Sequence, residues 1–160
     1  MRHLSIIVLM LFAGCASASN VSPSARSGNT AETPDHSAAK HCLALAMYWE
    51  ARGEGEQGML AVGSVVQNRV DSQLFPDTVC EVVKQGGEKP GCQFSWWCDG
   101  KSDRPTNKKV WRQAQILASQ LLKGRFDDPT RGALFFHHVS LEQPWDRPRT
   151  RRIGDHYFYR

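Results

Sequence analysis

Apolar residues recur every three or four positions over several stretches of the chain, and this spacing predicts helices. The first predicted helix covers residues 38–51. The same period predicts helices over residues 57–70 and 107–123, and glycines follow the first and the last of these segments. A shorter helix is predicted after Pro76, because proline suits a helix start.

Two short strands are predicted near the C-terminus. Residues 133–139 and 155–159 are rich in aromatic side chains, and a loop rich in proline and arginine joins them. A second long loop, residues 85–105, is rich in glycine and proline and carries two cysteines and two tryptophans. Together these elements predict an α+β fold, a mainly helical domain with a small C-terminal β-hairpin.

The N-terminal region lacks the pattern of a folded domain. Residues 1–18 combine a basic start, a short apolar run and small residues, which is typical of a secretory signal. Within it, residues 11–15 (LFAGC) resemble the bacterial lipobox, with phenylalanine where leucine is usual, so we expect Cys15 to carry a lipid; simple secretion is the alternative. Residues 19–37 are predicted to be a disordered tether, and residues 38–160 the catalytic domain.

The chain has five cysteines, and an odd number is unusual in an exported protein. A lipid on Cys15 would leave enough cysteines for two disulfides in an oxidising compartment. We favour the pairs Cys92–Cys98 and Cys42–Cys80, although the count alone does not choose between pairings. Zinc is the rival use of four cysteines, but the sequence has no Cys-x-x-Cys pair. We therefore expect no metal and no cofactor.

Glu50 is the leading candidate for catalysis. It shares a helical stripe with Leu43 and Met47, so it should point into the protein, and it precedes a turn rich in glycine. Burial disfavours the charged form of a carboxyl and raises its pKa, which lets a general acid keep its proton near neutral pH. The structural alternative is a buried glutamate that pairs with Arg52 or Arg69.

Other candidates would contact sugar rings. Tryptophan offers a flat apolar face to a pyranose ring, while polar side chains bind hydroxyl and acetamido groups. Of the adjacent Trp96 and Trp97, one is expected in the core and one in the cleft. The candidate substrate-binding residues are Glu54, Gln93, Ser95, Trp97, His137 and Trp145. A glutamate near a helix start is also favourable without any function.

Six motifs in order carry a resemblance that covers residues 42–160. They are residues 48–54 (YWEARGE), 61–70, 75–80 (FPDTVC), 92–95 (CQFS), 132–137 (GALFFH) and 152–159 (RIGDHYFY). These motifs resemble the SleB-like cell wall hydrolase family. The resemblance implies a lysozyme-like fold related to lytic transglycosylases, and cleavage between N-acetylmuramic acid and N-acetylglucosamine. It also implies that Glu50 is the catalytic residue. Phe136 stands where the family often has tyrosine.

The sequence therefore predicts an exported, periplasmic enzyme, anchored to the outer membrane by its lipid, that acts on peptidoglycan. The formal net charge of +4 fits an anionic polymer, and the export signal argues against nucleic acid. Most glycosidases use two carboxylates, but only Glu50 has a suitable position, with Asp99 and Asp103 as weaker loop candidates. This favours a lytic transglycosylase. The alternatives are a hydrolytic muramidase, a non-catalytic glycan-binding module and a zinc amidase.

Overall fold

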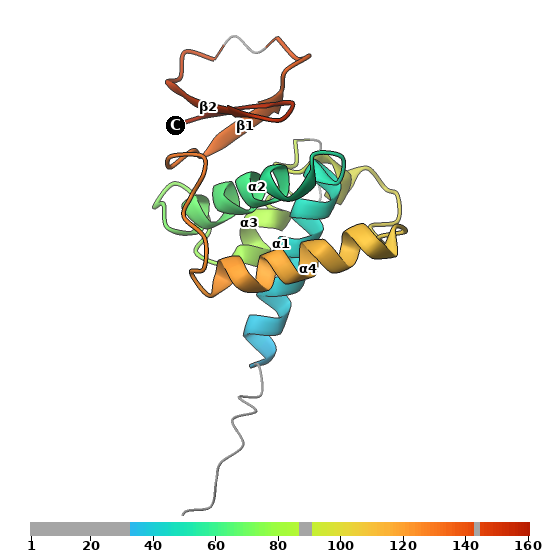
Figure 1. Ribbon diagram of the computed structural model, residues 1–160. Helices are drawn as coiled ribbons and strands as arrows, with labels where there is room; N and C mark the ends of the chain where they lie inside the picture. The colour runs from blue at the N-terminus through green and yellow to red at the C-terminus, as the bar shows by residue number, and fades with distance from the viewer. Residues whose placement is uncertain (1–32, 87–90, 143–144) are drawn as a thin grey trace, which may run out of the picture. The chain divides into compact units, whose positions relative to one another are not determined.

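Helix α1 (Pro34–Ala51) runs through the middle of the helical part of the fold, packed against α2 (Gly55–Val70), α3 (Val79–Lys84) and α4 (Lys108–Leu122) (Figure 1). The computed structural model describes residues 33–86, 91–142 and 145–160. In α1, every residue from Cys42 to Tyr48 is buried, whereas the sequence pattern indicated a single buried stripe. A helix enclosed by neighbours buries all of its faces, and three helices surround this one.

Helix α1 begins four residues earlier than the sequence pattern indicated. The Thr33 hydroxyl accepts a hydrogen bond from the His36 backbone N–H at 3.3 Å, and Pro34 occupies the first helical turn. Residues 34–37 therefore belong to the helix and not to the predicted tether. The remaining tether, the predicted signal and Cys15 lie outside the described residues. No helix in the described part of the chain is both long and apolar enough to cross a membrane.

A glycine lies at the contact between α1 and α2. A Cβ added at Gly63 of α2 would collide with the ends of the Met47 and Leu121 side chains, which would have to shift to make room for it. Helices α3 and α4 begin at capping residues. Thr78 accepts from Glu81 N at 3.3 Å, and Asn107 accepts from Val110 N at 3.2 Å.

The C-terminal part forms a three-stranded antiparallel sheet, so the predicted two-stranded hairpin was incomplete. Its strands are β1 (Phe135–His138), β2 (Arg149–Ile153) and β3 (His156–Tyr159), in the order β1-β3-β2. The arginine-rich segment predicted as a loop pairs with β3 through its backbone, and Gly154 makes the turn at a φ of 55°. Arginine side chains can stay in solvent while the backbone joins the sheet. The arginine-rich composition therefore indicated a loop and not this strand.

One face of this sheet packs on α2. Phe158 of β3 is buried with Ala61 and Val65 of α2, and Phe136 and Ile153 pack around them. The end of α2 also holds the start of β1, because Asn68 Nδ2 donates to the Ala133 carbonyl at 3.0 Å. The position of the sheet relative to the helices is therefore set by both apolar and hydrogen-bonded contacts.

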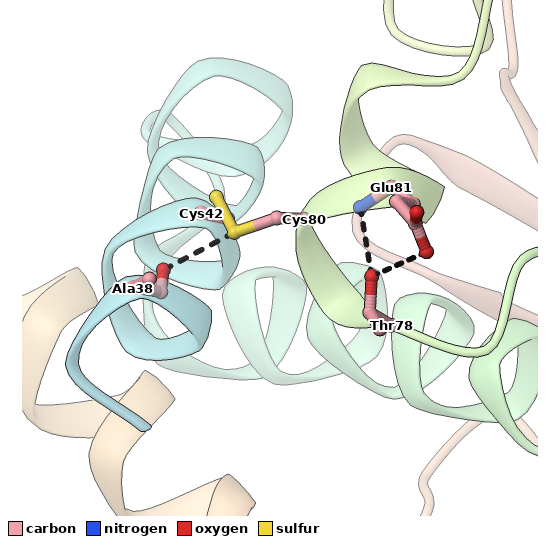
Figure 2. The surroundings of a disulfide bond; sticks show 5 residues. All are labelled: Ala38, Cys42, Thr78, Cys80 and Glu81. Carbon is pink, nitrogen blue, oxygen red and sulfur yellow. Dashed lines mark hydrogen bonds between the residues drawn. A yellow bond between two sulfur atoms is a disulfide. The ribbon is translucent and has the colours of Figure 1, made fainter. Parts of the chain in front are cut away.

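Two disulfides join segments that are separate in the sequence. The α1–α3 disulfide links Cys42 to Cys80, and Figure 2 shows it between the two helices, with Cys80 Sγ 3.3 Å from the Ala38 carbonyl oxygen. The second bond, Cys92–Cys98, closes the loop that contains the short 3-10 helix η1 (Ser95–Cys98). This is the pairing that the sequence analysis favoured.

Candidate active site

A cleft of about 560 Å³ lies where the end of α1, the disulfide-closed loop and strand β1 meet. Its lining residues are Glu50, Arg69, Cys92, Gln93, Ser95, Phe135, Phe136, His137, His138, Leu141, Trp145, Arg147 and His156. The structure thus brings together five of the predicted site residues, which are Glu50, Gln93, Ser95, His137 and Trp145. Sequence positions 50 to 156 contribute to one cavity, so only the tertiary fold could assemble it.

Glu50 stands at the wall of this cleft, one residue before the end of α1. Burial raises the pKa of its carboxyl from the ordinary 4.5 to about 7, although the Trp96 side chain and the positive charge of Arg69 pull the pKa the other way. The Trp96 indole N–H is itself buried without a well-aligned hydrogen bond in the described part of the chain. Glu50 can therefore exist both with and without its proton near neutral pH.

The sequence also allowed a purely structural interpretation, in which an arginine neutralises Glu50. The described residues do not form such an ion pair. Arg52 stacks over Trp49, with its guanidinium carbon 4.8 Å from the ring centroid, and it forms no ion pair with Glu50 in the described part of the chain. Arg69 acts on Glu50 through its charge, but the two side chains make no ion pair within the described ranges. A carboxyl without a close counter-ion in a buried wall has the environment of an acid–base group.

Arg69 is a site residue that the sequence analysis considered only as an ion-pair partner. It is 3% exposed, its Nε donates to the Leu134 carbonyl at 2.8 Å, and its guanidinium carbon lies 5.0 Å from the Phe75 ring centroid. Burial lowers its pKa to about 10, so it remains a cation at neutral pH. Nothing in the sequence pattern indicated a charge inside the cleft at this position.

His137 is held in a fixed orientation by two hydrogen bonds. Its Nδ1 lies 2.9 Å from the His138 carbonyl oxygen, and its Nε2 lies 2.9 Å from the Tyr159 hydroxyl. A carbonyl only accepts, so Nδ1 carries the proton, and in the neutral ring Nε2 accepts from Tyr159. The Trp145 ring meets His137 edge-on, with centroids 5.3 Å apart. These side chains form a rigid aromatic wall of the cleft.

Glu54, predicted as a substrate contact, is not among the residues that line the cleft. Its Oε1 lies 2.7 Å from Nδ1 of His156, which does line the cleft, and its Oε2 accepts from the Asp155 backbone N–H at 3.2 Å. The imidazole nitrogen is not aligned for a hydrogen bond in this contact. A side chain at Gly154 would collide with the Glu54 carboxylate. Glu54 therefore joins the start of α2 to the β2–β3 turn.

The two adjacent tryptophans divide differently from the expectation. Trp96 is 8% exposed and packs in the core, as expected for one of the pair. Trp97 is partly buried, with the Lys84 ammonium 4.9 Å from its ring centroid, and it does not line the cleft. The 3-10 helix η1 turns successive side chains to different directions, and only Ser95 of this helix reaches the cavity.

The loop carboxylates considered as partners of Glu50 lie elsewhere. Asp99 forms an exposed ion pair with Lys101 at 3.4 Å, and the Asp103 carbonyl accepts from the Trp49 indole at 3.2 Å. Neither aspartate lines the cleft, so Glu50 is the one carboxylate among the described lining residues. Across the described ranges, no group of three or more His, Cys, Asp or Glu side chains is arranged to hold a metal ion.

Fold and site together define a small, mainly helical domain with a glutamate of raised pKa in the wall of a cleft. The chain belongs to the cell wall hydrolase family, whose profile matches residues 53–159. The family expected from the sequence motifs is thereby confirmed. The matched region begins after Glu50, so the role of Glu50 rests on its surroundings and on the motif that contains it.

Known relatives agree with this assignment. The chain is 35% identical to a spore cortex-lytic enzyme of Bacillus subtilis over 72% of its own length and 35% of that protein. It is 31% identical to a spore cortex-lytic enzyme of Oceanobacillus iheyensis, again over 72% of its length and 39% of the relative. The chain thus spans well under half of these relatives.

Solved structures show the same fold. The catalytic domain of the germination-specific lytic transglycosylase SleB from Bacillus anthracis superposes with a TM-score of 0.62 and 29% identity, over 82% of this chain and 98% of that domain. The catalytic domain of the Bacillus cereus SleB protein gives a TM-score of 0.60 and 28% identity, over 83% and 99%. The expected mainly helical α+β fold is confirmed.

Proposed function

We propose that this chain cleaves the glycan strands of peptidoglycan between N-acetylmuramic acid and N-acetylglucosamine, with Glu50 as the general acid. The observation that carries the proposal is the Glu50 carboxyl, whose pKa burial raises to about 7 at the wall of a cleft. An acid with a pKa near the working pH is suited to protonate the glycosidic oxygen as the bond breaks. Family membership and the names of the relatives support the same substrate class.

The proposed product is a 1,6-anhydromuramyl end, as in a lytic transglycosylase. Hydrolysis with inversion or retention normally uses a second carboxylate, as base or nucleophile. Among the described lining residues Glu50 has no such partner. After it donates its proton, ionised Glu50 can accept the proton of the sugar's own 6-hydroxyl, whose oxygen then bonds to the anomeric carbon. The positive charge of Arg69 would stabilise the ionised carboxylate between these two steps.

The sugar contacts we propose are the exposed Gln93 and Ser95 on one wall and His137 and Trp145 on the other. The amide and hydroxyl can bind acetamido and hydroxyl groups, and Trp145 offers a ring face or edge for a pyranose. Because Tyr159 and the His138 carbonyl hold His137 from both sides, its ring is already oriented before a substrate arrives. Such pre-organisation lowers the entropic cost of positioning a glycan.

We propose further that the chain is exported, and that a lipid on Cys15 anchors it to the outer membrane, facing the periplasm. The lipobox-like sequence at residues 11–15 supports the lipid. The two disulfides support an oxidising compartment, because reducing compartments rarely keep such bonds. The mass of the protein extracted from membranes tests the lipid; a soluble mature chain that begins at Ser19 would contradict it.

Digestion of purified peptidoglycan tests the catalytic proposal. The parent, Glu50→Gln and the control Glu56→Gln, which alters an exposed glutamate, are compared for released muropeptides. Loss of a general acid should lower the rate about 100-fold or more, whereas the control should retain it. A Glu50→Gln variant that keeps more than about a tenth of the parent rate contradicts the assignment.

The same digest separates the rival reactions. Anhydro ends are one water lighter than hydrolytic ends, and they resist reduction by borohydride. If every new end accepts hydride, the enzyme is a hydrolytic muramidase. If folded parent protein binds the glycan and releases no product, it is a non-catalytic binding module.

A further inference from the structure

A β-bulge places two arginines on the outer face of the C-terminal sheet. In β3, Phe158 points towards α2, so its neighbours Tyr157 and Tyr159 point to the opposite face. Arg149 pairs with Tyr159 and Arg152 pairs with Tyr157, and the register shifts between them at Thr150. Residues three apart in a regular strand point to opposite faces, but the extra residue of the bulge brings both arginines to the tyrosine face.

Both guanidinium groups lie over the same ring. The guanidinium carbon of Arg149 is 4.7 Å from the Tyr157 ring centroid, and that of Arg152 is 5.7 Å away. With Thr150 and Arg151 they line a hollow of about 440 Å³. We call Arg149, Arg152 and Tyr157 the arginine clamp. A guanidinium stacked on an aromatic ring keeps its in-plane N–H groups available for a carboxylate.

The positive charge of the clamp is not neutralised within the protein. Arg149, Arg151 and Arg152 are exposed, and none forms an ion pair with a carboxylate in residues 33–86, 91–142 or 145–160. One N–H of Arg152, at Nε, is used by the Gly154 carbonyl at 3.3 Å, which fixes the direction of that side chain. The remaining donors face solvent, in an arrangement that suits an anion with two oxygens in one plane.

The clamp is continuous with the catalytic cleft. His137 lines the cleft and pairs across the sheet with Tyr157, and their ring centroids are 5.8 Å apart. Arg147, which also lines the cleft, stands two residues before Arg149. A polymer held in the cleft would therefore have its side branches next to the clamp.

We propose that the arginine clamp binds carboxylates of the peptides attached to the glycan strand. This inference rests on the proposed function and adds a specificity to it: strands that still carry their acidic peptides should bind better than bare strands. Peptide carboxylates fit planar guanidinium donors, and they are the anionic branches of a glycan that lies in the adjacent cleft. The clamp contributes to binding of the attached peptides and not to cleavage of the glycan strand.

The test measures binding of the full chain, made inactive by Glu50→Gln, to two glycan preparations. One carries its peptides and the other has had them removed by an amidase. Arg149→Gln/Arg152→Gln is compared with Arg112→Gln/Arg125→Gln, which removes the same charge from one exposed position on α4 and one just after it. We expect the clamp variant to bind peptide-bearing strands about tenfold more weakly, with the difference shrinking at high salt. Its affinity for bare strands should match that of the control.

Several results would overturn the inference. Equal losses on both preparations would mean that the arginines attract the polymer only by general charge, and no loss would mean that they do not contact it. Arginine-dependent binding to vesicles of anionic phospholipid, without discrimination between the two strands, would assign the surface to a membrane. Failure of the Glu50→Gln protein to bind either glycan preparation would also overturn the inference. Urea unfolding of each variant verifies that the fold is kept.

The outcome is separable from that of the proposed function. Products released by the parent chain decide whether the glycan is cleaved, whereas the clamp is judged from binding by inactive protein. A parent that cleaves both preparations, with clamp variants that do not discriminate, would refute the clamp alone.

Discussion

The raised pKa of Glu50 predicts that its carboxyl increasingly destabilises the folded protein as pH rises above 4.5. Its pKa rises from 4.5 to about 7, because the folded protein buries the carboxyl. Each unit of pKa corresponds to about 1.36 kcal/mol, so an ionised Glu50 in the folded state costs about 3 kcal/mol relative to the unfolded chain. Glutamine has nearly the same shape and no charge, so Glu50→Gln should remove this cost.

The sign follows from proton binding. Below pH 4.5 the folded and the unfolded chain both keep the proton, and Glu50 has no pH-dependent effect on stability. Between pH 4.5 and about 7 only the folded protein keeps it, so the free energy of unfolding falls as pH rises. Above about 7 both states are ionised, and the full cost remains.

The assay is urea unfolding of the parent and of Glu50→Gln, at about half-unit steps between pH 4 and 8 with disulfides intact. The variant's advantage in unfolding free energy should grow by about 3 kcal/mol across this range, mostly between pH 4.5 and 7. Other titrating groups are common to both proteins and cancel in the difference. An advantage that changes by less than about 1 kcal/mol would refute the argument that burial raises this pKa.

Three further predictions follow from the site and the disulfides. Glycan cleavage should fall as pH rises through about 7, about tenfold per unit above it, as protonated Glu50 is lost; a muropeptide-release profile that stays flat to pH 9 would contradict this. Glu54→Gln should lower the unfolding free energy by about 1–3 kcal/mol compared with Glu56→Gln, because His156 and the β2–β3 turn lose a buried partner. Removing the α1–α3 disulfide, which closes a separation of 38 residues, should cost about 4 kcal/mol by chain entropy; the second bond, with a separation of 6, should cost about 2. Urea unfolding of paired serine variants measures both values, and equal losses would argue against the entropic account.

The sequence was sufficient where the signal is local. Helical periods predicted α1, α2 and α4 to within a few residues, and Pro76 indicated that the short α3 follows it. The stripe that contains Glu50 predicted a carboxyl in an apolar wall, and the structure gives that carboxyl a raised pKa. Burial of a helix position can be anticipated from its neighbours three and four residues away, because these share its face.

Amino-acid composition gave a wrong prediction for β2, because its side chains are typical of a loop whereas its backbone forms a strand. The segment that forms β2 has arginine at three of its five positions, so it resembled a solvated loop. Its backbone nevertheless pairs with β3, and its arginine side chains remain in water. An edge strand can be this polar, because only the backbone must be satisfied by its neighbour.

What only the tertiary structure decided is which distant side chains meet. Glu54 pairs with His156, about a hundred positions later in the chain, and so supports the sheet instead of lining the cleft. Arg69 brings a buried charge into the cleft, and Trp97 turns away from it. Local sequence sets the face on which a side chain lies, but its partner depends on how whole elements pack. The amino-acid pattern therefore predicted that Glu50 lies in an apolar wall, whereas the packing of α1, α2 and the sheet determined its surroundings.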